Sequence, residues 1–184
     1  KAPHFNRLSD FMNAVGTYDL LQRLLTITAL PLKHLEDSYS LDSSGFGSYQ
    51  YERWMQAKFK NKRGWRNYVK GHVCIGTRTN IVCSAEITYG NESDAKQAPK
   101  LLESLRKFNL KQVSGDKAYS SYKILEIVES MGAEPFMAFK DNANPTKNSP
   151  EIWKRVYNYF KENKEEYMNQ YHKRSNVETC FSMI

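Results

Sequence analysis

The stretch "YVKGHVCIGTRTNIVCSAEITYG", residues 68–90, decides the fold. Apolar and polar positions alternate along its first half, so that Val73 and Ile75 share one face while Lys70 and His72 share the other. This alternation is typical of β-strands with one buried face, and the central "GTRTN" consists mainly of turn residues. The sequence therefore predicts a hairpin of two long strands. They cover about residues 68–76 and 81–89.

Another strand precedes the hairpin. Tyr39 and Leu41 alternate with Ser38, Ser40 and Asp42, as a half-buried strand requires. The next residues, "SSG", favour a turn and are expected to end the strand. Asp42 is therefore predicted at a strand terminus.

Helices and strands alternate after the hairpin. Two short strand patterns, "KQVSGDKAY" and "EPFMAFK", are separated by the helical pattern "SSYKILEIVESMG", and two further helices close the chain. The first of these strands ends at Gly115 and Asp116. Strands followed by such alternation predict an α/β fold with a mixed five-stranded sheet and helices on its faces.

A helical pattern also opens the chain. Leu20, Leu21, Leu24 and Leu25 form the stripe of an amphipathic helix, and Gly16 is expected to divide the region into two helices. We expect residues 1–34 to form an N-terminal helical segment and residues 35–184 to form the main domain.

Composition narrows the class of partner. The 184 residues carry 27 basic and 20 acidic side chains, a net charge of +7. A basic balance favours a polyanion, nucleic acid first, although a basic surface without a function is the open alternative. The three cysteines match no zinc pattern, and their odd number argues against a disulfide framework. No signal peptide or membrane-length apolar run is visible, and a reducing compartment fits best.

A basic and aromatic segment lies at residues 49–67, where six Lys and Arg residues face a single acid and alternate with aromatic residues. This composition fits a DNA track. The alternative is an amphipathic hairpin or helix whose aromatic residues belong to the core. The DNA contacts expected here are Lys62, Arg63 and Arg66.

Three acids occupy positions that suit chemistry: Asp42, Asp116 and Glu178. Strand ends in an α/β sheet gather side chains from distant parts of the sequence into one cleft. Converging carboxylates repel one another unless cations intervene, and carboxylate oxygens suit Mg²⁺ or Mn²⁺. The alternative is that these acids are ordinary members of a set of 20.

The chain closes with "YHKRSNVETCFSMI". On a single helix, Tyr171, Arg174 and Glu178 fall within an arc of roughly 60°, and Val177 and Phe181 fall on a neighbouring arc that can pack on the sheet. One interpretation is a solvated Arg174–Glu178 pair. The sharper one is an acid for metal, a guanidinium for phosphate and a ring for an unstacked base.

These stretches resemble a known family. "LDSSGF", "GDKAY" and "YHKRSNVETCFSMI" resemble the three acidic motifs of DDE transposases of prokaryotic insertion sequences, the last being similar to the signature Tyr-x-x-Arg-x-x-x-Glu. "YVKGHV" and "PFMAFK" are similar to the second and fifth strands of that family. The resemblance covers about residues 37–184 in the right order. The signature continues to a Lys at position 185, so the C-terminal helix is expected to be truncated.

The resemblance implies a ribonuclease-H-like fold and a set of site residues. It implies catalytic, metal-binding roles for Asp42, Asp116 and Glu178, which would hold two Mg²⁺ ions that Mn²⁺ can replace. It also implies DNA contacts by Tyr171, Arg174, Lys70 and His72, the last two near Asp42, although both could be ordinary sheet-surface residues.

The implied function is metal-dependent cleavage and strand transfer at the ends of an insertion sequence. The expected partners are double-stranded DNA, both terminal inverted repeats and target, and a second subunit in the active DNA complex. The expected location is the cytoplasm of a prokaryote, in association with the nucleoid and not with a membrane. Two alternatives stay open: an inactive or domesticated DNA-binding derivative, and a ribonuclease-H-like nuclease that cleaves without joining strands.

Overall fold

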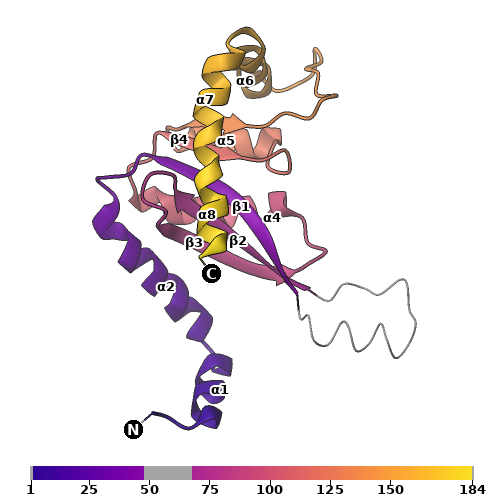
Figure 1. The fold of residues 1–184 in the computed structure, drawn as a ribbon. Coiled ribbons are helices and arrows are strands. Elements are labelled where there is room, and N and C mark those ends of the chain that lie inside the picture. Colours follow the sequence, from indigo (N-terminus) through magenta and orange to yellow (C-terminus); the bar gives the residue numbers. More distant parts are fainter. Residues whose placement is uncertain (1, 48–67, 184) are drawn as a thin grey trace, which may run out of the picture.

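The fold is built on one mixed five-stranded sheet with the order β3-β2-β1-β4-β5 (Figure 1). A computed structural model describes residues 2–47 and 68–183. β1 pairs antiparallel with β2, and β2 pairs antiparallel with β3. β4 runs parallel to β1, and β5 runs parallel to β4. The strands are β1 (Ser38–Gly47), β2 (Tyr68–Gly76), β3 (Val82–Tyr89), β4 (Gln112–Gly115) and β5 (Glu134–Met137).

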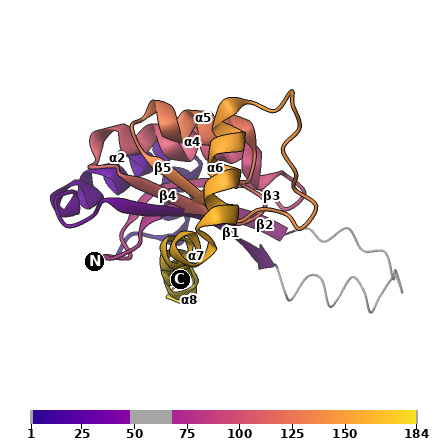
Figure 2. The ribbon, with the colours of Figure 1, turned by 90° about the horizontal axis from the view of Figure 1, so that it is seen from above.

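Helices cover both faces of this sheet. α4 and α5 lie on one face, while α7 and α8 cross the other, as the view from above makes clear (Figure 2). The helices are α1 (Phe5–Asn13), α2 (Thr17–Ala29), α4 (Asp94–Glu103), α5 (Tyr122–Ser130), α6 (Glu151–Glu162), α7 (Lys164–His172) and α8 (Asn176–Ser182). Short 3₁₀ helices span Leu30–Leu32, Ser104–Lys107 and Lys173–Ser175. The strand order and directions confirm the predicted α/β, ribonuclease-H-like fold.

The first strand is longer than the sequence indicated. Asp42 was expected at a strand terminus, and this is wrong: β1 continues to Gly47, and Asp42 lies in its middle. The reason is the neighbouring strand, because β2 pairs with β1 all the way to the Gly47–Tyr68 pair. Small polar residues and glycine stay extended when a partner strand satisfies their backbone groups.

The closing helix is not a regular α-helix over its whole length. α7 ends at His172, the 3₁₀ turn Lys173–Ser175 follows, and α8 begins at Asn176. The expectation that Tyr171, Arg174 and Glu178 share one regular α-helix is therefore wrong. A 3₁₀ helix turns by about 120° per residue, against about 100° in an α-helix, so the three residues of the turn rotate Glu178 by roughly 60° relative to Tyr171.

The main core lies between the sheet and helices α4 and α5, and α6 and α7 add Ile152, Val156 and Tyr167 to it. Leu41, Cys74, Leu101 and Leu125 are all completely buried there. A smaller cluster on the opposite face holds α8 against β2, through Val73, Ile75, Val177 and Cys180. All three cysteines are buried and unpaired, in agreement with the expectation that they form no disulfide.

The N-terminal region forms two helices, as predicted, and they divide at Gly16. This glycine has φ of +88°, a left-handed conformation that other residues adopt only with strain. α2 docks on the edge strand β3, where Gln22 donates to the Ala85 carbonyl and Tyr18 donates to Glu86 at 2.7 Å. The domain boundary after residue 34 stays a prediction.

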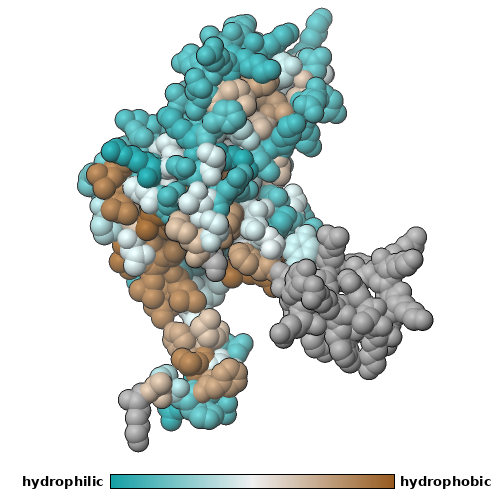
Figure 3. Space-filling view, viewed as in Figure 1, coloured by the Kyte–Doolittle hydropathy of each residue, from teal (hydrophilic) through white to brown (hydrophobic). Residues whose placement is uncertain are grey.

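The predicted leucine stripe of α2 is only partly buried by the described part of the chain. Leu20, Leu21 and Leu24 are 43–46% exposed, and α1 has no buried residue. Figure 3 shows the resulting apolar surface along this helical arm. Within residues 2–47 and 68–183, none of the helices has the length and apolar character that a membrane crossing requires.

The outer edge of β5 is closed by a tyrosine. The Tyr167 hydroxyl accepts the Met137 N–H and donates to the Met137 carbonyl, both at 2.9 Å. Tyr167 is completely buried, so water cannot replace these bonds. One side chain thus satisfies both backbone groups of an edge residue.

We expect Tyr167→Phe to lower the free energy of unfolding by about 1–3 kcal/mol, because it leaves two buried backbone groups without a partner. Urea denaturation followed by circular dichroism measures the change. The control is Tyr122→Phe, since Tyr122 is 46% exposed. Equal losses in both variants would contradict the role given to the Tyr167 hydroxyl.

Candidate active site

Asp42 lies at the centre of the candidate site, on the face of the sheet that α8 crosses. Its register partner across β2 is Val73, which packs under α8. Its side chain is 14% exposed. One carboxylate oxygen, Oδ1, accepts the Ser43 N–H at 2.9 Å, and Oδ2 lies 3.4 Å from Nη2 of Arg174.

The environment of Asp42 opposes ionisation. Burial raises the pKa of the Asp42 carboxyl, and the charges of Asp116 and Glu178 raise it further. The Ser43 N–H and the Arg174 guanidinium partly offset this rise in pKa. Three acids from three distant parts of the chain therefore act on one another here.

Asp116 follows the last residue of β4. Gly115 pairs with Leu41 across the parallel strands, so Asp116 comes directly after the position that lies beside β1. A side chain at Gly115 would meet Met137 Sδ at 2.9 Å and Tyr119 Cβ at 3.1 Å, so only glycine permits this packing. Asp116 Oδ1 accepts the Ala118 N–H at 2.8 Å, which fixes the carboxylate on its turn.

Glu178 comes from α8 and is exposed. The helix is held in place by Val177 and Cys180, which pack on Val73 and Ile75 of β2. Glu178 is thus carried on a helix whose opposite side is anchored to the sheet. Its charge still contributes to the raised pKa of Asp42.

Arg174 and Tyr171 flank the acids. Arg174 lies in the 3₁₀ turn and pairs with Asp42 rather than with Glu178. Its guanidinium carbon lies 5.9 Å from the centre of the Tyr171 ring. Its Nε is buried without a hydrogen-bond partner among the described residues. Within this part of the chain the arginine is therefore held by one long contact, with donors left over for an anion.

The donor set fits a hard divalent cation in its chemistry. Three carboxylates act on one another, and Asp42 is ionised only against their repulsion, which a cation would relieve. In the arrangement described for residues 2–47 and 68–183, no three acidic, histidine or cysteine side chains yet lie close enough together to hold a metal ion. Arg174 is the positive group that Asp42 contacts instead.

Lys70 and His72 do not lie beside Asp42, and that prediction is wrong. Side chains alternate along β2, and the partner of Asp42 is Val73, so both residues point to the opposite, α4 face. His72 is completely buried, and its Nε2 lies 2.8 Å from Thr88 Oγ1. Lys70 pairs with Asp94 at 2.6 Å. His72 cannot touch DNA in this conformation.

The other predicted DNA contacts, Lys62, Arg63 and Arg66, lie outside the described residues. Two residues that sequence reasoning missed are Asp94, the first residue of α4, and Tyr119. The signal for Asp94 was an acid at the start of a predicted helix, which could pair with the polar face of the strand that carries Lys70 and His72. Tyr119 stands within "GDKAY", the stretch that carries Asp116.

At pH 7 and without divalent cations, we expect Asp42→Asn to melt at the same temperature as the natural protein or higher. The raised pKa means that the ionised carboxyl is less favourable in the folded state than in the unfolded state, so its charge costs stability. This cost disappears as the pH falls towards 3.8, the ordinary value. Melting curves in EDTA test it, with the 98%-exposed Asp141→Asn as the control. A clear drop in melting temperature would refute this reading.

We expect the contribution of His72 to stability to fall as the pH drops from 7.5 to 5.5. Burial lowers the pKa of His72, with Lys70 acting in the same direction and Asp94 and Glu86 against it. Below about 6.5 the unfolded chain binds a proton that the folded protein excludes, so acid favours unfolding. His72→Gln should flatten this slope in urea titrations, whereas the exposed His172→Gln should not. Identical slopes in both variants would rule His72 out.

Comparison with known proteins identifies the family. The transposase DDE domain family matches residues 34–184. No curated protein matches the sequence significantly. One similar solved structure is an intasome of simian T-cell lymphotropic virus in complex with PP2A regulatory subunit B56 gamma. It is 17% identical with a TM-score of 0.37, and the match covers 70% of this chain and 42% of that one.

The catalytic core domain of BIV integrase is 13% identical with a TM-score of 0.35, over 76% of this chain and 79% of that chain. The chain thus spans less than half of the first of these two proteins. Both scores are too low to support an argument, so the assignment rests on the family match and on the three motifs in their order. The match extends over most of the chain and includes Asp42, Asp116 and Glu178. This protein belongs to the transposase DDE domain family.

Proposed function

We propose that this domain is the catalytic part of a DNA transposase. It cleaves a phosphodiester bond at the end of a mobile element and joins the freed 3′-hydroxyl to target DNA. The observation that carries the proposal is the position of Asp42 on β1 and of Asp116 directly after the adjacent parallel strand β4, with Arg174 in contact with Asp42. Membership of the transposase DDE domain family supports the same reaction.

The three acids are the proposed holders of divalent metal. Asp42, Asp116 and Glu178 would together bind two Mg²⁺ ions, or Mn²⁺ in their place. Bound in this way, such ions stabilise charge on the attacking and leaving oxygens of a phosphoryl displacement. Backbone N–H groups orient two of these carboxylates. Ser43 N–H donates a hydrogen bond to Asp42, and Ala118 N–H donates one to Asp116.

Arg174 and Tyr171 are the proposed DNA contacts. The guanidinium has unused donors and a single long contact to Asp42, so a DNA phosphate can compete for it. The Tyr171 ring, already against the guanidinium, offers a face to an unstacked base. Both residues would orient the scissile phosphate, while sequence recognition would come from elsewhere.

The proposed partners are the terminal repeats of the element and a target duplex. A net charge of +7 favours such a polyanion. A dimer in the DNA complex, and a location on the nucleoid of a prokaryote, also belong to this proposal.

The decisive test follows cleavage and joining separately. The protein is incubated with a labelled duplex from the element's own end and a supercoiled plasmid, in Mg²⁺ or Mn²⁺. We expect cleavage and joined products, and a loss of at least about 100-fold in Asp42→Asn, Asp116→Asn and Glu178→Gln, because each variant removes a carboxylate that would hold the metal ions. Glu162→Gln is the matched control, since Glu162 is an exposed acid on α6.

Each other outcome points to a different protein. Cleavage without joined products would indicate a nuclease of the same fold. DNA binding without cleavage would indicate an inactive or domesticated derivative. Full activity in Asp42→Asn would sink the assignment of the acids.

A further inference from the structure

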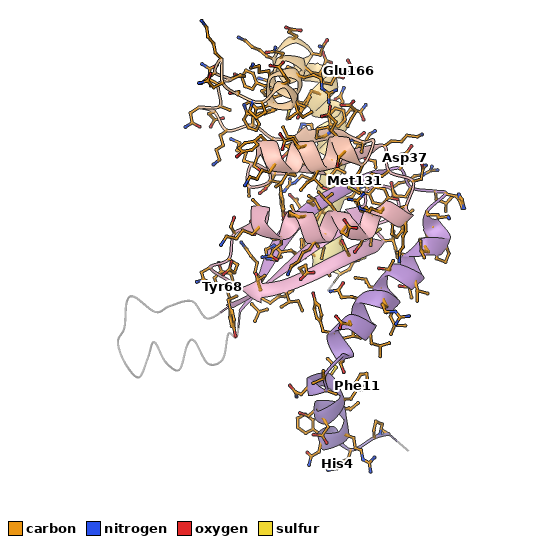
Figure 4. All side chains as sticks on the ribbon, turned by 180° about the vertical axis from the view of Figure 1, so that it is seen from behind. His4, Phe11, Asp37, Tyr68, Met131 and Glu166 are labelled. Atoms are coloured by element: carbon orange, nitrogen blue, oxygen red, sulfur yellow. The ribbon has the colours of Figure 1, made fainter. Side chains whose placement is uncertain are left out.

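A partly buried polar cluster lies on the α4 face of the sheet, opposite the face that carries Asp42. It consists of Lys70, His72, Thr88 and Asp94, and we call it the α4-face cluster. Asp94 links its members: Lys70 Nζ lies 2.6 Å from Asp94 Oδ1, and His72 Nδ1 lies 3.4 Å from the same oxygen without the alignment of a hydrogen bond. The cluster ties the start of α4 to β2. Figure 4 views the molecule from this side.

The cluster reaches the strand that carries Asp42. His72 is the register partner of Ser43, the residue after Asp42. Side chains alternate along β1, and Leu41 faces the main core, so Ser43 also points towards the α4 face. The side chains of Asp42 and Ser43 therefore point to opposite faces of the sheet, the carboxylate towards α8 and the hydroxyl towards α4.

Tyr119 approaches the same place from the loop that carries Asp116. Its N–H donates to the Asp116 carbonyl at 3.1 Å, which closes the turn after β4. Its side chain packs against Gly115, where an added Cβ would lie 3.1 Å from Tyr119 Cβ. Tyr119 is thus fixed to both residues at the end of β4.

The hydroxyl of Tyr119 is completely buried and has no hydrogen-bond partner within the described residues. Burial raises the pKa of Tyr119, and the charges of Asp94, Asp42 and Asp116 add to the rise. Ser43 acts in the other direction on this pKa, in keeping with its place on the same face of the sheet, two residues beyond Leu41, the register partner of Gly115. An orphaned buried hydroxyl costs stability, and phenylalanine would avoid that cost.

We propose that Tyr119 is a positioning residue: when the site binds a divalent cation, its hydroxyl pairs with Ser43 and fixes the backbone of Asp42 relative to Asp116 from beneath the sheet. The inference rests on the proposed function, because it assumes that these acids bind metal. It adds a residue that touches neither metal nor DNA.

The test separates positioning from packing. Tyr119→Phe keeps the ring and removes only the hydroxyl, so the metal-free variant should melt at the same temperature as the natural protein or higher. Its affinity for Mn²⁺, measured by calorimetry without DNA, should fall about 10-fold or more, as for other groups that orient metal ligands. Tyr122→Phe, an exposed tyrosine of the following helix, should change neither quantity.

A double-mutant cycle identifies the partner. Ser43→Ala should weaken Mn²⁺ binding by a similar factor, and the double variant should be no weaker than either single one, since both remove the same bond. Additive losses, or Mn²⁺ affinity unchanged in Tyr119→Phe, would overturn the inference. If the natural protein binds Mn²⁺ and cuts DNA while Tyr119→Phe matches it, only this inference fails. If the natural protein does neither, the proposed function fails and takes the inference with it.

Discussion

The parallel pairing of β1 with β4 is the constraint on which the rest of the site depends. Its last register pair, Leu41 with Gly115, fixes where two distant parts of the sequence meet. Asp42 is the next residue of β1, and Asp116 directly follows the end of β4. A shift of this register by one residue would turn Asp42 into the main core, where an unpaired carboxylate is costly. Hydrophobic burial of Leu41 therefore holds the acids in place as well as the sheet.

The two faces of β1 have different surroundings. On one face, Asp42 meets Arg174 and the influence of two further acids. On the other, Ser43 adjoins a cluster of charged and polar groups that ties α4 to the sheet. The repelling acids on the α8 face of β1 are thus accompanied by polar contacts on its α4 face, in addition to apolar packing. Carboxylates that repel one another need a rigid backbone to stay close together, because each side chain can otherwise move apart into water.

Much of the fold could be predicted from the sequence, because strong local signals agreed with one another. The hairpin of residues 68–90 and the helix between the two short strands are local features, and both occur as expected. The length of β1 could not be predicted, because "SSG" is held extended by β2 and not by its own preference. The faces of Lys70 and His72 were misassigned for a related reason. The alternation gave their shared face correctly, but only the register with β1 tells which face Asp42 occupies.

The short 3₁₀ turn between α7 and α8 has a geometric consequence for the signature Tyr-x-x-Arg-x-x-x-Glu. Three residues wound at about 120° instead of 100° rotate everything beyond them by roughly 60°. Over the seven residues from Tyr171 to Glu178, this rotation moves Glu178 from about 20° on one side of Tyr171 to about 40° on the other, so the two residues still face roughly the same way. The same rotation sets the direction of Val177 and Cys180, which meet β2. A regular α-helix through residues 173–175 would turn these two apolar side chains by roughly 60° relative to α7.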